Sequence, residues 1–387
     1  MKIYISGIGC VCALGENIKE ISKNLFEQNI EPSFPISRLK SSFEREYPVF
    51  QVSQDILKQK KDDESFSFLF LRKALDEALE NAALSAADLK KYRVGVCIGT
   101  SVDASFKCFD LYKSWKQKEP VSNSLLDKYL NYSISQNVLD YLEIKGISQT
   151  IVTACASGTD AVGICSKWIE SGLCDIGIAG GADEIDLIPY TGFIKLMLAS
   201  KESCKPFDKN RKGINLGEGA GVFILSGKDN GKNCGTVLGY GNASDGYHNT
   251  SPHPEGRGLK KALLSALKES GAQIEEIAFI NAHGTASVDN DAAEAKVFNA
   301  LLKDIPVCAT KGLTGHCLGA AGAVEAVLSQ ISLHCRKIPK TKNFKEADAN
   351  LHLIPALENT DIEKNIALSD SLSFGGCNSV LVLGGKI

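Results

Sequence analysis

The chain has 387 residues, of which 44% are hydrophobic and 23% are charged, and its formal net charge is −3. This composition is that of a folded protein with one large core or two fused ones, and it excludes a disordered chain. The small negative charge offers no global basic field for nucleic acid, and no run of 18 apolar residues predicts a membrane span.

The cysteine usage points to a reducing compartment. The 13 cysteines are an odd number without regular spacing, and none forms a C-x-x-C pair. This pattern argues against a secreted disulfide framework and against zinc, and it favours a cytoplasmic protein. The first ten residues are apolar but broken by glycines and lack a cleavage site, so they predict a first strand and turn rather than a signal peptide. The densest basic cluster, Lys58, Lys60 and Lys61, is a candidate for docking an acidic partner.

Two pairs of segments far apart in the chain resemble each other. Residues 72–79 predict an amphipathic helix that is followed by a buried strand over 94–100 ending in Gly-Thr. Residues 260–267 and 277–285 repeat this helix, strand and Gly-Thr turn. The next units also agree, since strand, turn and Gly/Ala-rich helix follow over 151–163 and again over 307–327.

These repeats predict an internal duplication of α/β halves. Helices so rich in glycine and alanine have little side-chain bulk, and we expect them to be buried between layers. We therefore expect a five-layer α-β-α-β-α sandwich. The halves are predicted to span 1–234 and 235–387, with a ligand site where they meet.

Cys155 lies where an apolar run, Ile151 to Ala154, gives way to the small residues that begin the next helix. At such a turn the thiol faces the positive end of the helix, which can lower a cysteine pKa to ~3.5–7.5. This position predicts a nucleophile that attacks a thioester, against the alternative of a buried structural cysteine.

Two histidines in the second half follow predicted strand ends. His283 stands in the run 281–285 and His316 in the run 311–316, each flanked by glycine and threonine. Taken singly, each is as well explained by a structural role as by a catalytic one. If the halves pack about a pseudo-twofold axis, both histidines converge on Cys155.

The motifs together resemble those of the β-ketoacyl-[acyl carrier protein] synthases, condensing enzymes of the thiolase-fold superfamily, and the resemblance covers the whole chain. Any one motif is weak, but seven occur in order: residues 153–158, 180–184, 206–208 with Arg211, 217–221, 281–285, 311–322 and 374–378.

The resemblance implies roles for several residues. Cys155 is expected to take the acyl chain as a thioester, and His283 and His316 to bind the malonyl thioester oxygen while carbon dioxide leaves and an enolate forms. Lys311 and Glu325 match a buried pair expected behind the second histidine, where they would orient His316 and balance charge.

Further residues are implied for binding and gating. The backbone N–H groups of Cys155 and Phe374 would form the oxyanion hole, and Phe374 would also act as the gate for the acyl chain. Thr285 and Ser287 match two hydroxyls that hold the pantetheine arm, and the flanking Gly375 and Gly376 let the backbone approach the substrate.

Asp291 and Glu294 match an acidic pair and are expected to cap the next helix. The chain also departs from the family pattern. Asp370, Leu372 and Ser373 replace the usual Asn, Phe and Gly, which predicts a stiffer gating loop and an altered chain-length preference. The segment over 184–206 is shorter than is typical, which affects one wall of the acyl pocket.

The resemblance thus implies decarboxylative condensation of malonyl-carrier with an acyl group on Cys155, for fatty acid, polyene or polyketide synthesis. The implied partner is acyl carrier protein, and the implied assembly is a homodimer, with a heterodimer as the alternative. No cofactor, metal, nucleic acid or membrane is expected.

Three other functions remain open. A chain-length-factor-like subunit would lack the nucleophile, which is present here. A coenzyme A thiolase would use a second cysteine, for which Cys377 is the candidate. A cysteine hydrolase would need one histidine as a base and open access for water.

Overall fold

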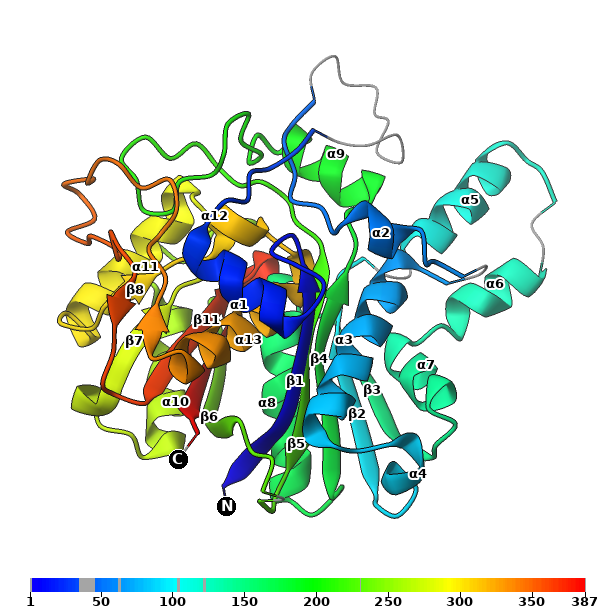
Figure 1. Ribbon diagram of the computed structural model, residues 1–387. Helices are drawn as coiled ribbons and strands as arrows, with labels where there is room; N and C mark the ends of the chain where they lie inside the picture. The colour runs from blue at the N-terminus through cyan, green and yellow to red at the C-terminus, as the bar shows by residue number, and fades with distance from the viewer. Residues whose placement is uncertain are drawn as a thin grey trace.

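The computed structural model describes residues 2–34, 46–61, 64–102, 105–120, 123–229 and 231–386. Its main feature is a set of ten strands in the order β3-β2-β4-β5-β1-β6-β12-β11-β7-β8 (Figure 1). A separate two-stranded ribbon pairs β9 with β10. Among the residues that the structure describes, no helix combines the length and apolar character needed to cross a membrane.

The ten strands fall into two groups of five with the same internal arrangement. In the first group β2 pairs in parallel with β3 and β4, whereas β5 pairs antiparallel with β4 and β1. In the second group β7 pairs in parallel with β8 and β11, whereas β12 pairs antiparallel with β11 and β6. A short ladder between β1 and β6 joins the groups. The strands are β1 (Ile3–Cys12), β2 (Val94–Gly99), β3 (Gly146–Ile151), β4 (Ile176–Asp183), β5 (Gly219–Ser226), β6 (Gly235–Ser244), β7 (Ile277–Asn281), β8 (Val307–Cys308), β9 (Lys337–Ile338), β10 (Thr360–Asp361), β11 (Ile366–Leu372) and β12 (Cys377–Gly385).

The predicted duplication is therefore confirmed at the level of strand order and direction. The helices predicted over 72–79 and 260–267 lie inside α3 and α10. The helices are α1 (Ile18–Glu27), α2 (Gln54–Leu57), α3 (Phe66–Ala82), α4 (Ala86–Leu89), α5 (Ser105–Lys116), α6 (Asn123–Leu130), α7 (Ile134–Tyr141), α8 (Ser157–Glu170), α9 (Leu187–Lys195), α10 (Arg257–Ser270), α11 (Val288–Leu301), α12 (Lys311–Thr314) and α13 (Ala321–His334).

Helices α8 and α13 form the inner layer between the two groups of strands. They pack on each other, and each contacts strands of both groups, whereas α3 covers β1 and β5 and α10 covers β6 and β12 (Figure 1). Both inner helices need small residues so that α8 and α13 can pack closely against each other. A Cβ on Gly158 of α8 would lie only 2.8 Å from the backbone N of Ala323 in α13, so a larger residue would force the helices apart. The structure has the five layers expected from the sequence.

The Gly/Ala-rich helix expected within 307–327 begins at Ala321. A short 3-10 turn, η4 (Leu318–Ala320), precedes α13, and a matching turn, η2 (Ala154–Ala156), precedes α8. In each turn the first residue has a left-handed backbone, with φ of 50° at Ala154 and 52° at Leu318. The two halves thus repeat even this irregular feature, and only the first half places a cysteine in it.

Candidate active site

The nucleophile candidate lies on a tightly held turn. Cys155 is the middle residue of η2, directly before α8, and its side chain is buried. The side chain of Ser157 accepts a hydrogen bond from the N–H of Thr153, and the Thr153 hydroxyl donates to the carboxylate of Asp160. The left-handed Ala154 costs about 1–3 kcal/mol of backbone strain, and these contacts hold it in place.

The expected low pKa of Cys155 is wrong. Burial raises the pKa of this thiol to about 11, although the Lys311 charge and hydrogen bonds from the N–H groups of Phe374 and Cys155 itself lower it. Complete removal from water disfavours the thiolate more than these groups favour it. The thiol is therefore neutral at rest, and its proton must leave as the acyl group arrives.

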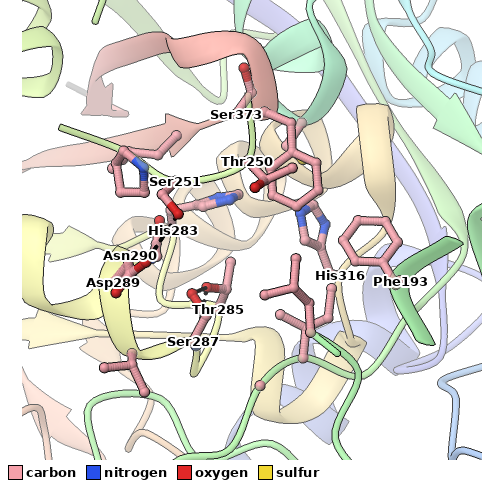
Figure 2. Close-up of a pocket in the computed structure, with 18 of the residues that line it drawn as sticks. Phe193, Thr250, Ser251, His283, Thr285, Ser287, Asp289, Asn290, His316 and Ser373 are labelled. Carbon is pink, nitrogen blue, oxygen red and sulfur yellow. Dashed lines mark hydrogen bonds between the residues drawn. The ribbon is translucent and has the colours of Figure 1, made fainter. Parts of the chain in front are cut away.

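The structure brings Cys155, His283 and His316 together. Potential ligand atoms of the three side chains all lie within 4.8 Å of one another, although His283 and His316 come from separate turns of the second half. The two imidazole rings meet edge to face, with 5.1 Å between their centroids (Figure 2). The His316 backbone is also bound to the first half, because its N–H donates to Asn215 O and its carbonyl accepts from Gly217 N–H.

Hydrogen bonds determine the tautomer of both histidines. An ammonium group and a backbone N–H can only donate, so Nδ1 must accept from Lys311 Nζ in His283 (3.0 Å) and from the Leu318 N–H in His316 (3.1 Å). Burial and the Lys311 charge lower the pKa of both imidazoles well below the usual value, so both are neutral at neutral pH. Each neutral ring therefore carries its proton on Nε2, which gives two N–H donors beside the sulfur.

This arrangement does not fit a metal. Cysteine and two histidines are a soft ligand set that would suit Zn²⁺. However, a metal needs a lone pair on Nε2 of each ring, and those nitrogens carry hydrogen here because Nδ1 of each ring already accepts a hydrogen bond. The site therefore offers donors to an oxygen atom rather than ligands to a cation.

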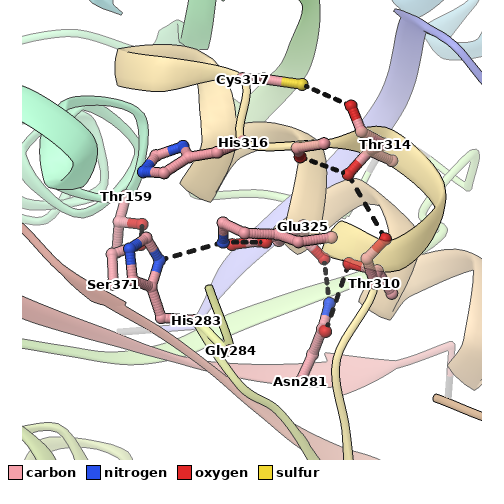
Figure 3. A network of polar contacts seen from close by, with 12 residues as sticks. Thr159, Asn281, His283, Gly284, Thr310, Thr314, His316, Cys317, Glu325 and Ser371 are labelled. Atoms are coloured by element: carbon pink, nitrogen blue, oxygen red, sulfur yellow. Dashed lines mark hydrogen bonds and ion pairs between the residues drawn. The ribbon is translucent and has the colours of Figure 1, made fainter. Parts of the chain in front are cut away.

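Lys311 and Glu325 lie behind His283, not behind His316 as the sequence suggested. Lys311 begins α12, and its ammonium donates to His283 and forms an ion pair with Glu325 of α13 (Figure 3). The resemblance implied a place behind the second histidine, whereas the Lys311 ammonium contacts His283, which follows the end of strand β7. Burial raises the pKa of Glu325 to about 7, against the opposing effect of Lys311.

Breaking this ion pair is expected to destabilise the fold. Lys311→Met leaves Glu325 buried without its cation, and removal of one partner of a buried pair costs about 3–5 kcal/mol. The free energy of unfolding, measured by urea denaturation at about pH 9, should fall by up to this amount, because protonation of Glu325 in the variant relieves part of the cost. Lys91→Met, in the exposed pair with Asp88, is the control and should change little. Equal effects of the two substitutions would contradict this account of the pair.

A cavity opens from the sulfur toward the surface. Its wall includes Cys155, both histidines, Phe374, Thr285 and Ser287, and the two hydroxyls lie 3.0 Å apart (Figure 2). These are the positions expected for the nucleophile, the oxygen donors, the gate and the pantetheine arm.

Gly375 and Gly376 are not part of this wall, although the sequence suggested substrate contact. Both have a left-handed backbone, with φ of 82° and 81°. The N–H of Gly375 donates to Asn249 O, and the carbonyl of Gly376 accepts from Asp245 N–H. Their backbone groups therefore attach the Phe374 turn to the loop after β6 instead of pointing at a ligand.

Sequence reasoning missed one side of the cavity. Phe193 of α9 stacks on Phe374 with 5.3 Å between ring centroids and also lies beside His316 (Figure 2). Other wall residues without a recognisable motif are Met197, Leu198, Lys212, Ile214, Thr250, Ser251 and Pro252. The segment over 184–206, noted as short, thus supplies an aromatic ring that packs on Phe374, the residue expected to be the gate. No local pattern around Phe193 distinguishes it from a core phenylalanine.

Comparisons with known proteins agree with this geometry. Residues 1–230 match the family "Beta-ketoacyl synthase, N-terminal domain", and residues 234–345 match "Beta-ketoacyl synthase, C-terminal domain". The 3-oxoacyl-[acyl-carrier-protein] synthase 2 of Synechocystis sp. is 30% identical, over 98% of this chain and 97% of the relative. The protein of the same name from Staphylococcus aureus (strain N315) is 29% identical, over 98% and 97%.

Solved structures include similar chains of two-component ketosynthases. The ishigamide ketosynthase/chain length factor superimposes with a TM-score of 0.91 at 27% identity, covering 100% of this chain and 99% of that one. A ketosynthase in complex with its chain length factor from Xenorhabdus doucetiae gives a TM-score of 0.85 at 31% identity, covering 100% and 98%.

Proposed function

Since this chain belongs to the β-ketoacyl synthase family, we propose that Cys155, His283 and His316 carry out its decarboxylative condensation. The chain is an acyl-transferring condensing enzyme that works with acyl carrier protein. The observation that supports the residue roles most directly is the convergence of one buried thiol and two buried neutral imidazoles, each with Nε2–H free, in a single cavity.

The first step loads the acyl chain. The Cys155 sulfur attacks the acyl-carrier thioester, a new C–S bond forms, and the carrier leaves as its thiol with the proton that Cys155 gives up. The N–H groups of Cys155 and Phe374 lie at the sulfur and stabilise negative charge as it develops there and on the adjoining carbonyl oxygen. Phe374 must move away from Phe193 to admit the chain, because the two rings are stacked beside the nucleophile.

The second step generates the carbon nucleophile. The thioester oxygen of malonyl-carrier binds between the two Nε2–H groups, the bond to the carboxylate breaks, and carbon dioxide leaves an enolate. The two donors stabilise this oxygen more strongly as it becomes negative, so they lower the barrier rather than only binding the substrate. The enolate carbon then attacks the acyl carbonyl, the C–S bond breaks, and β-ketoacyl-carrier is released, while the Cys155 sulfur takes a proton from water and returns to its neutral thiol.

The test is the identity of the carrier-bound product. Purified enzyme is incubated with malonyl-carrier and a panel of acyl-carriers, and the carrier is analysed by intact-protein mass spectrometry. A β-ketoacyl product that is longer by two carbons than the primer supports the proposal. Free fatty acid without ketoacyl product would instead identify a hydrolase.

The other candidate functions fit the geometry less well. A hydrolase needs an imidazole nitrogen free to accept a proton, and both Nδ1 atoms are already hydrogen-bonded. A thiolase would need a second thiol at the site, but Cys377 is not among the described residues of the cavity wall. A chain-length factor would lack the nucleophile, whereas the present chain could be the active half of a heterodimer. Size-exclusion chromatography with mass determination of the purified chain decides between homodimer and heterodimer.

We also propose that the carrier docks near α2, where Lys58, Lys60 and Lys61 are exposed. Neutralising all three by Lys→Gln substitution should weaken carrier binding and raise KM for acyl-carrier, since exposed cations attract an acidic partner. The control is the same substitution of Lys260, Lys261 and Lys268 on α10, on another part of the surface (Figure 1). Unchanged affinity of the α2 variant, measured by titration calorimetry, would remove this assignment.

We also propose a division of the chain and a compartment. The chain divides into halves at residues 234 and 235, which the repeated strand order supports. The protein works in the cytoplasm, which the free thiols support, because every cysteine with a described side chain is unpaired.

A further inference from the structure

One buried carboxylate of the first half of the chain is bonded to the turn η4 of the second half. Asp183 is the last residue of β4, and its side chain is 0% exposed. Its oxygens accept from the Thr100 hydroxyl at 2.6 Å and from the N–H groups of Ser101 and Val102 at 2.8 and 2.9 Å, directly after β2. Oδ2 also accepts from the N–H of Gly319 in η4, at 2.6 Å.

These surroundings fit an ionised carboxylate. A backbone N–H can only donate, and such donors face both oxygens of Asp183. Among the described residues, the partners of this carboxylate are three N–H groups and one hydroxyl, not a lysine or an arginine. Burial raises the pKa of Asp183 to about 7, although these hydrogen bonds lower it. The carboxylate is therefore ionised in mildly alkaline solution, where its hydrogen bonds are stronger than those between neutral groups.

The bonded N–H is next in the chain to the one that determines the tautomer of His316. Leu318 N–H donates to Nδ1 of His316, and Leu318 has a left-handed backbone with φ of 52°. A leucine is strained in this conformation, so the turn needs outside contacts to keep it. Asp183 supplies one contact through the N–H of Gly319. The Leu318 side chain supplies another, since it lies in the same small apolar cluster as Val102.

The turn approaches the carboxylate too closely for a side chain. A Cβ on Gly319 would lie 2.7 Å from the backbone N of Ser101 and 2.8 Å from Oδ2 of Asp183. Any larger residue at this position would therefore push η4 away from the carboxylate.

The turn after His283 is also held by carboxylates, but from its own half. Oε2 of Glu294 accepts from the N–H of Gly284 at 2.9 Å, and Asp291 accepts from the N–H of Ala286 at 3.1 Å. The expected helix-capping role of Asp291 and Glu294 is therefore replaced by contacts to this loop.

We propose that Asp183 is a positioning residue that holds His316 in the tautomer with hydrogen on Nε2, beside Cys155. The carboxylate belongs to the half that carries the nucleophile, and it binds the turn of the other half. When this contact is lost, the Leu318 N–H no longer stays on Nδ1, and the ring can carry its proton on Nδ1 instead. Nε2 is then an acceptor beside the acyl thioester. The positioning role rests on the proposed function of His316.

The first measurement is decarboxylation of malonyl-carrier at about pH 8.5, where the carboxylate of the wild type is ionised. Asp183→Asn keeps the shape of the side chain, but its amide nitrogen cannot accept from an N–H. Its kcat should fall about 10- to 100-fold, the effect of a misplaced catalytic group. KM should change little, because the His316 donor acts mainly in the transition state. A wild-type kcat in Asp183→Asn overturns the proposal.

The matched control is Glu77→Gln. Glu77 is also a carboxylate that accepts from two backbone N–H groups, those of Cys10 and Ile18, and it does not line the cavity. The substitution removes the same charge from the same kind of contact, and decarboxylation should keep the wild-type rate. A loss in Glu77→Gln equal to that in Asp183→Asn would overturn the assignment, because it would show a general effect of lost carboxylates.

The second measurement separates positioning from general loosening of the fold. In hydrolysis of the acyl-enzyme, water adds to the thioester, the C–S bond breaks, and free acid and the Cys155 thiol form. In Asp183→Asn the Nε2 lone pair of His316 can take the proton of that water, so hydrolysis should rise at least about tenfold. Mass spectrometry of isolated acyl-enzyme over time measures this rate. A purely structural contact would leave hydrolysis unchanged, and that result overturns the positioning role.

Two further variants apply if Asp183→Asn does not fold. Gly319→Ala breaks the same contact from the other half without removing the charge, and it should change both rates in the same directions. Thr100→Val removes only the hydroxyl donor, so decarboxylation should fall about threefold. Wild-type rates of decarboxylation and hydrolysis in a folded member of this set overturn the proposal.

Failure of the proposed function gives a different result. If His316→Ala decarboxylated malonyl-carrier at the wild-type rate, the proposed role of His316 would be wrong. If His316→Ala were slow while Asp183→Asn matched the wild type, only the positioning role of Asp183 would be wrong.

Discussion

Cys155→Ala should abolish both the acyl-enzyme and the β-ketoacyl product, with product formation falling at least about a thousandfold. The reason is that Cys155 supplies the single thiol on the described wall of the cavity, so no neighbouring group can take over the attack. Alanine already occupies the flanking positions of the turn, and the substitution should leave the fold intact. Intact-protein mass spectrometry after incubation with acyl-carrier measures the acyl-enzyme directly.

The same variant should still release carbon dioxide from malonyl-carrier, because the two imidazole donors are unchanged. Cys165→Ala is the control. It removes another buried thiol on α8 that does not line the cavity, and it should still form the acyl-enzyme. Acylation of Cys155→Ala at the wild-type level would refute the nucleophile assignment.

His283→Ala and His316→Ala should each slow decarboxylation by about 10²–10³-fold, the effect of losing one donor worth ~2.7–4 kcal/mol in the transition state. Both rings present Nε2–H because Lys311 and the Leu318 N–H occupy their Nδ1 atoms. Each variant therefore loses one of the two hydrogen bonds to the enolate oxygen. Carbon dioxide release from malonyl-carrier is the measurement, and acylation of Cys155 should persist in both variants.

A control for the histidine variants is His334→Ala at the exposed end of α13, which should decarboxylate at the wild-type rate. If His283→Ala or His316→Ala decarboxylated as fast as this control, the enolate-binding role would fail for that residue. If both variants also lost acylation of Cys155, the histidines would act on the Cys155 thiol rather than on the malonyl thioester.

The fold could be predicted from the sequence because its signals are local and repeated. The repeated helix, strand and Gly-Thr turn found over 72–100 and 260–285 gave the duplication, and the Gly/Ala content of α8 and α13 indicated an inner helical layer. The meeting of Cys155 with both histidines followed from that duplication. Each of these inferences needed only the periodicity of a segment and its neighbour in the chain.

The errors concern contacts that depend on side-chain reach and burial. The sequence places Lys311 close to His316, but its long side chain turns to His283. A helix terminus suggested a low pKa for Cys155, yet full burial raises the pKa to about 11. The stacking of Phe193 on Phe374 joins two elements with no common motif. None of these features has a periodic signature, so they emerge only when the elements are packed.

The tautomers that Lys311 and Leu318 impose on the two histidines affect the lifetime of the proposed acyl-enzyme. A water molecule beside the proposed acyl thioester needs somewhere to leave a proton before it can attack, and neither ring has an open lone pair to receive one. Hydrolysis of the acyl-enzyme should therefore be slow. The enzyme can then retain its acyl group on Cys155 while malonyl-carrier is scarce.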